Sequence, residues 1–211
     1  MRYDCRGQGA SPKPEGIYSL DDHVLDLNDL LEKLNLKNII LIGLSNGGRI
    51  SMEFSIRYPD FVKALVALDT YDDPTPMMKA KLNSWLTAHE VGGALHRFDI
   101  ATPWIWGEEV FNSKSELILA YREKAESLRP HVVNALISGA IETKIDLSKL
   151  SVKTLLVVGR EDLLTPVFIH EKMLSKIHNA QLVVVEGGHA SLIERPNIME
   201  KTILPWLLEL V

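Results

Sequence analysis

The sequence predicts an α/β fold with a mostly parallel sheet covered by helices, and two observations support this. Short apolar runs alternate with segments of helical periodicity along the chain. The apolar runs also lack the alternation of polar and apolar residues that is typical of a strand with one face in water. The predicted strands lie at residues 38–42, 61–68, 154–158 and 181–185. Buried strands that alternate with helices indicate a parallel sheet with helices on both faces.

Length and composition favour an ordinary globular enzyme-sized domain. The chain has 211 residues, of which 46% are hydrophobic and 24% charged, enough for one sizeable core. The net charge of −5 and the absence of a basic block argue against nucleic acid as a partner. No apolar run reaches the roughly 18 residues that a membrane span needs. Cys5 is the one cysteine, so no internal disulfide forms, and we expect a cytoplasmic protein with no membrane partner.

The first third of the chain reads as strand end, loop, helix and strand. Residues 1–4 are predicted as the end of a strand, followed by a polar loop that contains glycine and proline. Ser19 is a good helix N-cap, with Asp22 three positions on to support the first turn. Leucine and valine residues then recur at helical spacing through Asn35, which predicts an amphipathic helix leading into the strand at 38–42.

The segment Gly43-Leu44-Ser45-Asn46-Gly47-Gly48 joins that strand to a helix that ends near residues 58–59. A serine between glycines at a strand-to-helix turn is typical of a nucleophile elbow. We expect Ser45 to adopt a strained backbone conformation, because the turn is tight. Gly43 and Gly47 are expected to be required because a Cβ atom at either position would collide with the neighbouring strand or helix.

The pattern changes between residues 71 and 150, where helical segments replace strands. Helices are expected around residues 77–89, 114–128 and 130–139, with a loop at 104–107. We interpret residues 71–150 as an inserted helical cap, and residues 1–70 and 151–211 as the core that it interrupts. Trp104, Trp106 and His131 are candidate substrate contacts in this cap, although ordinary packing explains such residues at least as well.

The last third returns to alternating strands and helices. Thr165 and Pro166 are predicted as the N-cap and first residue of a helix that ends near residue 178. The last strand ends at Gly187-Gly188-His189, and a final helix is expected from Pro196 to Val211.

Four polar residues come directly after predicted strands: Ser45, Asp69, Asp162 and His189. The carboxyl ends of parallel strands meet at one edge of a sheet, so these residues are expected to share that edge. A serine hydroxyl needs a base to become nucleophilic, and histidine titrates in the right range. A carboxylate must then orient the imidazole, a role open to Asp162 or, as the weaker alternative, Asp69.

The sequence resembles the α/β-hydrolase family through four motifs in the family's order. They are Asp4-x-Arg6-Gly7-x-Gly9-x-Ser11, Gly43-x-Ser45-x-Gly47-Gly48, Gly159-x-x-Asp162-x-x-x-Pro166, and Gly188-His189 with Glu194-x-Pro196. The resemblance implies an α/β-hydrolase fold with Ser45 as nucleophile, Asp162 as acid, His189 as base and the Asn46 backbone N–H as an oxyanion-hole donor. It further implies a small ester, lactone or thioester as substrate, as in esterases and enol-lactonases, with no cofactor and no metal.

The sequence departs from the family's pattern at its start. The first strands, and the His-Gly loop that supplies a second oxyanion-hole donor, have no counterpart in it. Loss of one donor typically lowers the rate by about 10²–10³. We therefore expect an N-terminally truncated hydrolase of reduced activity. Its uncovered central strand would favour a homodimer through the exposed sheet edge. The alternative is a non-catalytic or weakly active binding or assembly protein on a truncated hydrolase scaffold.

Overall fold

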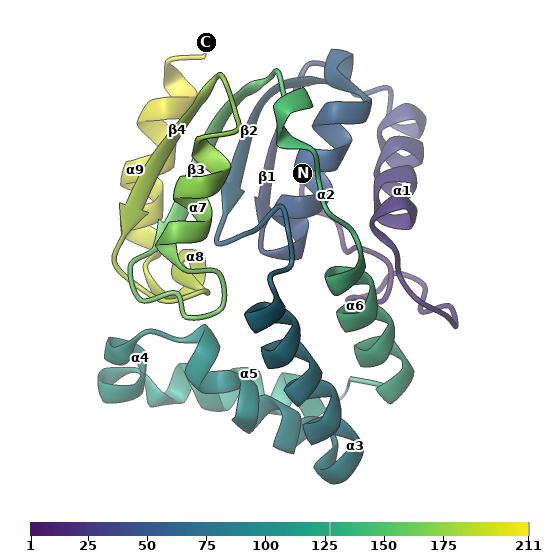
Figure 1. Ribbon diagram of the computed structural model, residues 1–211, viewed down its shortest axis with the longest axis vertical. Coiled ribbons are helices and arrows are strands. Elements are labelled where there is room, and N and C mark those ends of the chain that lie inside the picture. The colour runs from purple at the N-terminus through teal and green to yellow at the C-terminus, as the bar shows by residue number, and fades with distance from the viewer. Residues whose placement is uncertain (127, 211) are drawn as a thin grey trace.

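The computed structural model describes residues 1–126 and 128–210 and contains one parallel sheet (Figure 1). Its strands are β1 (Ile39–Leu44), β2 (Val62–Leu68), β3 (Lys153–Gly159) and β4 (Ala180–Val185). They lie in the order β1-β2-β3-β4, and every neighbouring pair is parallel. The register places Leu44 opposite Leu68, and Leu68 opposite Val157. The strands therefore end close together, as the sequence predicts.

Helices cover both faces of this sheet. One face packs on α1 (Leu20–Lys33), α2 (Asn46–Arg57) and α7 (Val167–Leu174), and the other packs on α9 (Pro196–Leu208). Neighbouring strand residues alternate between the two cores: Leu65 belongs to the first and Val66 to the second, which also contains Trp206. Because both faces are buried, the strands are apolar throughout, which explains why they lack a period-two pattern.

A layer of helices lies between β2 and β3 in the sequence. It consists of α3 (Pro76–Ile105), α4 (Glu108–Ser113), α5 (Ser115–Glu126) and α6 (Pro130–Glu142). In Figure 1 the strands point toward this layer, so it faces the carboxyl edge of the sheet. Interpretation of the layer as a separate cap domain over residues 71–150 stays a prediction.

Short sequence motifs determine where several helices begin and end. Ser19 caps α1, accepting the N–H of Asp22 at 3.1 Å, while the Asp22 carboxylate accepts the N–H of Ser19 at 3.0 Å. This reciprocal capping box is the arrangement expected from the sequence. The helix α2 ends at Arg57, just before Pro59, which also agrees with the sequence.

Two expectations about local structure were wrong. Residues 1–4 form no strand. The predicted loop at 104–107 begins later, because α3 continues to Ile105. Within α3, Gly93 breaks the helical geometry with φ 74° and ψ −167°, so the long helix is two legs joined at a turn that glycine adopts readily. Val211, the predicted end of the last helix, lies outside the described residues.

The helix α7 begins one residue later than predicted. Pro166 is its N-cap, with φ −63° and ψ 163°, and no side chain caps the helix. The Thr165 hydroxyl is not a cap, because it donates to Asp162 instead.

The strand β1 lies at the edge of the described sheet and pairs only with β2. Its Ile42 side chain is 51% exposed. A homodimer across this edge stays a prediction.

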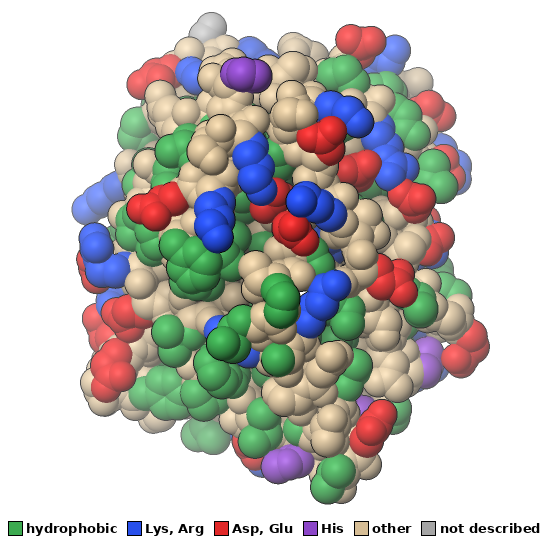
Figure 2. Space-filling model, in the orientation of Figure 1, with side chains coloured by type: hydrophobic (Ala, Val, Ile, Leu, Met, Phe, Trp, Pro, Cys, Tyr) green, Lys and Arg blue, Asp and Glu red, His purple; other side chains and the backbone are tan. Residues whose placement is uncertain are grey.

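No helix in the described residues has the length and apolarity needed to cross a bilayer. Figure 2 shows basic and acidic side chains interspersed over one face of the molecule, with no large area of a single charge.

Candidate active site

Ser45 occupies the tight turn between β1 and α2. Its backbone has φ 54° and ψ −119°, a left-handed conformation that costs energy for any residue with a side chain. Two contacts hold the turn: the Ser45 N–H donates to Leu68 O at 2.8 Å, and the Thr70 hydroxyl donates to Ser45 O at 2.7 Å. The strain expected from the sequence is therefore present, and the neighbouring strand β2 maintains it.

The glycines around Ser45 have unequal roles. A Cβ atom on Gly43 would lie 2.3 Å from the backbone oxygen of Gly47, so only glycine fits there. A Cβ atom on Gly47 would meet nothing within 4 Å, which contradicts the expected collision at that position. Gly48 takes the role instead, because its Cβ would lie 2.7 Å from the Thr70 hydroxyl oxygen. The close approach is thus between α2 and the end of β2.

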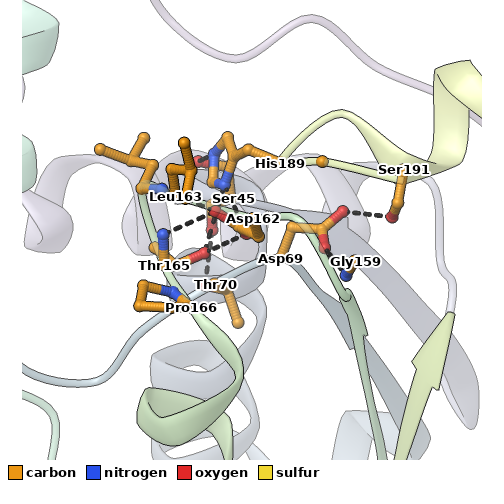
Figure 3. A network of polar contacts seen from close by, with 12 residues as sticks. Ser45, Asp69, Thr70, Gly159, Asp162, Leu163, Thr165, Pro166, His189 and Ser191 are labelled. Carbon is orange, nitrogen blue, oxygen red and sulfur yellow. Dashed lines mark hydrogen bonds and ion pairs between the residues drawn. The ribbon is translucent and has the colours of Figure 1, made fainter. Parts of the chain in front are cut away.

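The structure brings Ser45, His189 and Asp162 into one hydrogen-bonded chain (Figure 3). The Oγ of Ser45 lies 2.9 Å from Nε2 of His189, and Nδ1 of His189 lies 3.0 Å from Oδ2 of Asp162. His189 and Asp162 are buried, with 6% and 2% of their surfaces exposed. The three side chains come from the ends of β1, β4 and β3, so their convergence follows from the parallel topology.

The loop after β3 holds the Asp162 carboxylate with a set of donors. Oδ1 accepts the N–H groups of Leu164 at 2.8 Å and Thr165 at 2.7 Å, and Oδ2 accepts the Thr165 hydroxyl at 2.7 Å. The same hydroxyl oxygen lies 3.2 Å from Nδ1 of His189. Since its proton points at Asp162, Thr165 can only accept from the imidazole, which fixes the proton on Nδ1.

The pKa values of Asp162 and His189 are shifted in opposite directions by burial and by neighbouring charges. Burial alone would raise the pKa of Asp162, but His189 and the donors from Thr165 hold that pKa below its usual range. Burial alone would lower the pKa of His189, but Asp162 raises it above the usual value, with Asp69 adding to the effect. The carboxylate therefore stays ionised and stabilises a protonated imidazole.

Asp69 lies beside the three residues but points away from them. Its carboxylate accepts the Gly159 N–H at 2.8 Å and the Ser191 hydroxyl at 2.5 Å (Figure 3). Burial raises the pKa of Asp69 to about 7, despite the opposing effects of His189 and Ser191. The imidazole bonds to Asp162, so the geometry favours Asp162 as the orienting acid. Asp69 ties the ends of β2 and β3 to the loop that follows His189.

His170 is another buried histidine, and no sequence motif singles it out. Its Nε2 accepts the N–H of Thr70 at 3.0 Å, so the proton resides on Nδ1, 3.5 Å from Pro166 O. Burial lowers its pKa to about 4, which keeps the ring neutral. Thr70 supports the Ser45 turn, so His170 joins α7 to the nucleophile elbow through one intermediate residue.

The helical layer is bonded to the loop that carries His189. The Glu194 carboxylate accepts the Gly188 N–H at 3.1 Å and the Gly107 N–H at 3.2 Å. The backbone adds a bond from the Ala190 N–H to Ile105 O at 3.2 Å. Glu194 thus links the two segments through hydrogen bonds.

A cavity of about 520 Å³ opens above Ser45 and His189. This volume is in the range of small-molecule sites. Its wall is mostly apolar and includes Trp85 and Trp106. A substrate contact at Trp106 stays a prediction. Two other candidate contacts lie elsewhere. Trp104 is not part of the wall and packs under Lys81, whose Nζ is 4.6 Å from the ring centroid. His131 faces the N-terminal loop, with Nε2 3.4 Å from Lys13 O.

Asn46 also lines the cavity and is the first residue of α2. The N–H at this position has no acceptor within the helix, and the helix dipole adds partial positive charge. It is therefore free to bind a negatively charged oxygen beside Ser45. Among the described residues, no group of three or more His, Cys, Asp or Glu is placed to bind a metal ion.

Comparison with known proteins agrees with this fold. The family model described as the alpha/beta hydrolase fold matches residues 2–90. A RutD protein of Pseudomonas savastanoi pv. phaseolicola, provisionally named a carbamate hydrolase, is 27% identical over 97% of this chain and 82% of its own. A thermophilic esterase from Thermogutta terrifontis is 29% identical, with a TM-score of 0.88 over 98% of this chain and 78% of the esterase.

A second solved structure gives the same picture. MGS-M2, an α/β hydrolase from a deep-sea metagenome library of the Medee basin, is 27% identical, with a TM-score of 0.90 over 98% of this chain and 78% of that chain. Together these observations show that the chain has the α/β-hydrolase fold.

Proposed function

We propose that this protein is a serine hydrolase that cleaves a small carboxylic ester, lactone or thioester through an acyl-enzyme. One observation carries the proposal: the continuous path from Ser45 Oγ to His189 Nε2 at 2.9 Å, and from His189 Nδ1 to Asp162 Oδ2 at 3.0 Å. Nucleophile, base and orienting acid are each within hydrogen-bonding distance of the next, as acyl transfer requires.

In the proposed mechanism, His189 removes the Ser45 proton as the oxygen attacks the substrate carbonyl carbon. Asp162 stabilises the imidazolium, while the Asn46 N–H donates to the developing oxyanion. His189 then protonates the leaving group, and the acyl group remains on Ser45. A water molecule activated by His189 cleaves that ester and restores the free enzyme.

The wall of the cavity supports a small, mainly apolar acyl group. Its apolar surface would exclude water around the reacting carbonyl, which strengthens the electrostatic interactions there. The same steps would also cleave a carbamate. The similarity to RutD makes carbamates useful comparison substrates.

Reaction with a fluorophosphonate probe tests the proposal, because an activated serine displaces the probe's fluoride and becomes phosphonylated. We expect labelling of the folded protein and turnover of p-nitrophenyl butyrate, with both lost in Ser45→Ala. Ser84→Ala is the matched control, since that hydroxyl lies on the exposed side of α3 and contacts only Lys81 O. Absence of labelling in folded protein would instead support the alternative, a non-catalytic binding or assembly protein.

A further inference from the structure

The cavity above Ser45 has cationic side chains in its wall and no acidic ones. Arg97 of α3 and Lys124 of α5 line it, whereas no Asp or Glu is among its described lining residues. The chain as a whole carries 28 acidic and 23 basic residues. The cavity wall therefore has an excess of basic side chains, whereas the whole chain has an excess of acidic ones. The basic side chains create a positive potential inside an apolar cavity.

Arg97 stands out because its charge has no counterpart in the described residues. Its Nε is buried without a hydrogen-bond partner, and no carboxylate pairs with its guanidinium. Two arginines elsewhere are paired with carboxylates: Arg122 makes two bonds to Asp99, at 2.8 and 3.0 Å, and Arg6 makes two to Asp26, at 2.6 and 2.7 Å. Burial lowers the pKa of Arg97. Leaving a partly buried guanidinium unpaired is costly unless a ligand supplies the missing anion.

The fold holds Arg97 and Lys124 on the same wall. The turn at Gly93 directs the second leg of α3, which carries Arg97, along α5. The Arg122–Asp99 pair then joins these two helices, two residues away from each of the cations. Lys124 lies over the Tyr121 ring, with Nζ 4.8 Å from its centroid. The helical layer thus places Arg97 and Lys124 in the cavity wall.

We propose that the substrate carries a carboxylate that binds Arg97, while its ester or related acyl group reaches Ser45. This inference rests on the proposed hydrolase function and specifies its substrate class. A guanidinium offers parallel N–H donors that match the two oxygens of a carboxylate. Lys124 adds a second positive charge near the same group. Both interactions position the substrate and take no part in bond cleavage.

Two esters that differ in one group test this inference: mono-p-nitrophenyl adipate and p-nitrophenyl hexanoate. The first ends in a carboxylate where the second ends in a methyl group. We expect Arg97→Gln to lower the ratio of kcat/KM for adipate over hexanoate by about 10–100-fold, mainly through KM, as loss of a charged hydrogen bond predicts. Arg97→Lys should restore part of the ratio. Arg160→Gln is the control, because Arg160 pairs with Glu186 outside the cavity.

An unchanged ratio in folded Arg97→Gln would overturn the inference while leaving the hydrolase function intact. A binding measurement tests the same inference without requiring turnover. In Ser45→Ala, calorimetry with mono-p-nitrophenyl adipate should show binding that weakens about 10–100-fold when Arg97→Gln is added. Equal affinity with and without Arg97 would contradict the inference even if the wild-type protein hydrolyses neither ester.

Discussion

The carboxylate of Glu194 accepts the backbone N–H of Gly188, the residue directly before His189, at 3.1 Å. The same carboxylate accepts the Gly107 N–H from the helical layer. One side chain therefore fixes both the loop that carries His189 and part of the cavity wall. Glutamine in its place would turn an N–H₂ group toward backbone N–H donors, so one contact would be lost.

We expect Glu194→Gln to lower kcat by about tenfold, because small displacements of a catalytic group are costly. The folded protein should still react with a fluorophosphonate probe, only more slowly. Glu200→Gln on the exposed side of α9 is the matched control. Wild-type kcat in Glu194→Gln would show that the backbone alone positions His189.

The two candidate acids can be separated by one substitution each. Asp162→Asn should reduce kcat by a factor on the order of 10⁴, because it removes the charge that supports the imidazolium. Asp69→Asn should reduce kcat far less, since its carboxylate contacts Gly159 and Ser191 and not the imidazole. Steady-state kinetics on one ester measures kcat for both variants. A larger loss of kcat in Asp69→Asn than in Asp162→Asn would make Asp69 the acid that orients His189.

The activity should depend on pH through His189. The base must be neutral, and Asp162 raises the His189 pKa above its usual value. We therefore expect kcat/KM to rise with pH, with a midpoint above about 6.5. Asp69 titrates in the same range, so the Asp69→Asn variant is the control and should retain this limb. A midpoint at or below 6.5 in both proteins would contradict the proposed environment of the imidazole.

Asp69 should also make stability depend on pH. Its pKa rises from 3.8 to about 7 on folding, so the folded state holds the proton more tightly. This contribution to the free energy of unfolding is complete below pH 3.8 and is lost as pH rises through about 7. Asp69→Asn should flatten the decline between pH 3.8 and about pH 7, where the slope is about 1.36 kcal/mol per pH unit. Urea unfolding at several pH values measures it, and parallel curves for the two proteins would refute it.

Gly43 and Gly47 form a matched pair for testing the elbow. Gly43→Ala places a Cβ atom 2.3 Å from Gly47 O, so the strand and helix must separate. We expect loss of labelling at Ser45 and a destabilisation of several kcal/mol, typical of overpacking against backbone. Gly47→Ala meets nothing within 4 Å and should fold with wild-type stability. Thermal unfolding and probe labelling of both variants give the comparison, and similar behaviour would contradict the steric argument.

The sequence predicted those features whose signals are local or set by topology. The capping box of Ser19 and Asp22 spans three positions, and Ser45, Asp162 and His189 each follow a strand, so parallel topology alone places them together. Contacts that cross long stretches of chain left no such signal. His170 bonds to Thr70 across 100 positions, and Glu194 bonds to Gly107 across 87. Residue type alone could not reveal these pairings, nor show which aromatic residues line the cavity.

The turn at Gly93 has a wider consequence. It sets the direction of the leg of α3 that carries Arg97, and that leg ends at Ile105, whose carbonyl accepts the N–H of Ala190 beside His189. A residue with a side chain at Gly93 would strain the turn that aims this leg. Recognition and bond cleavage are therefore mechanically linked, and evolution cannot adjust this hinge for selectivity alone.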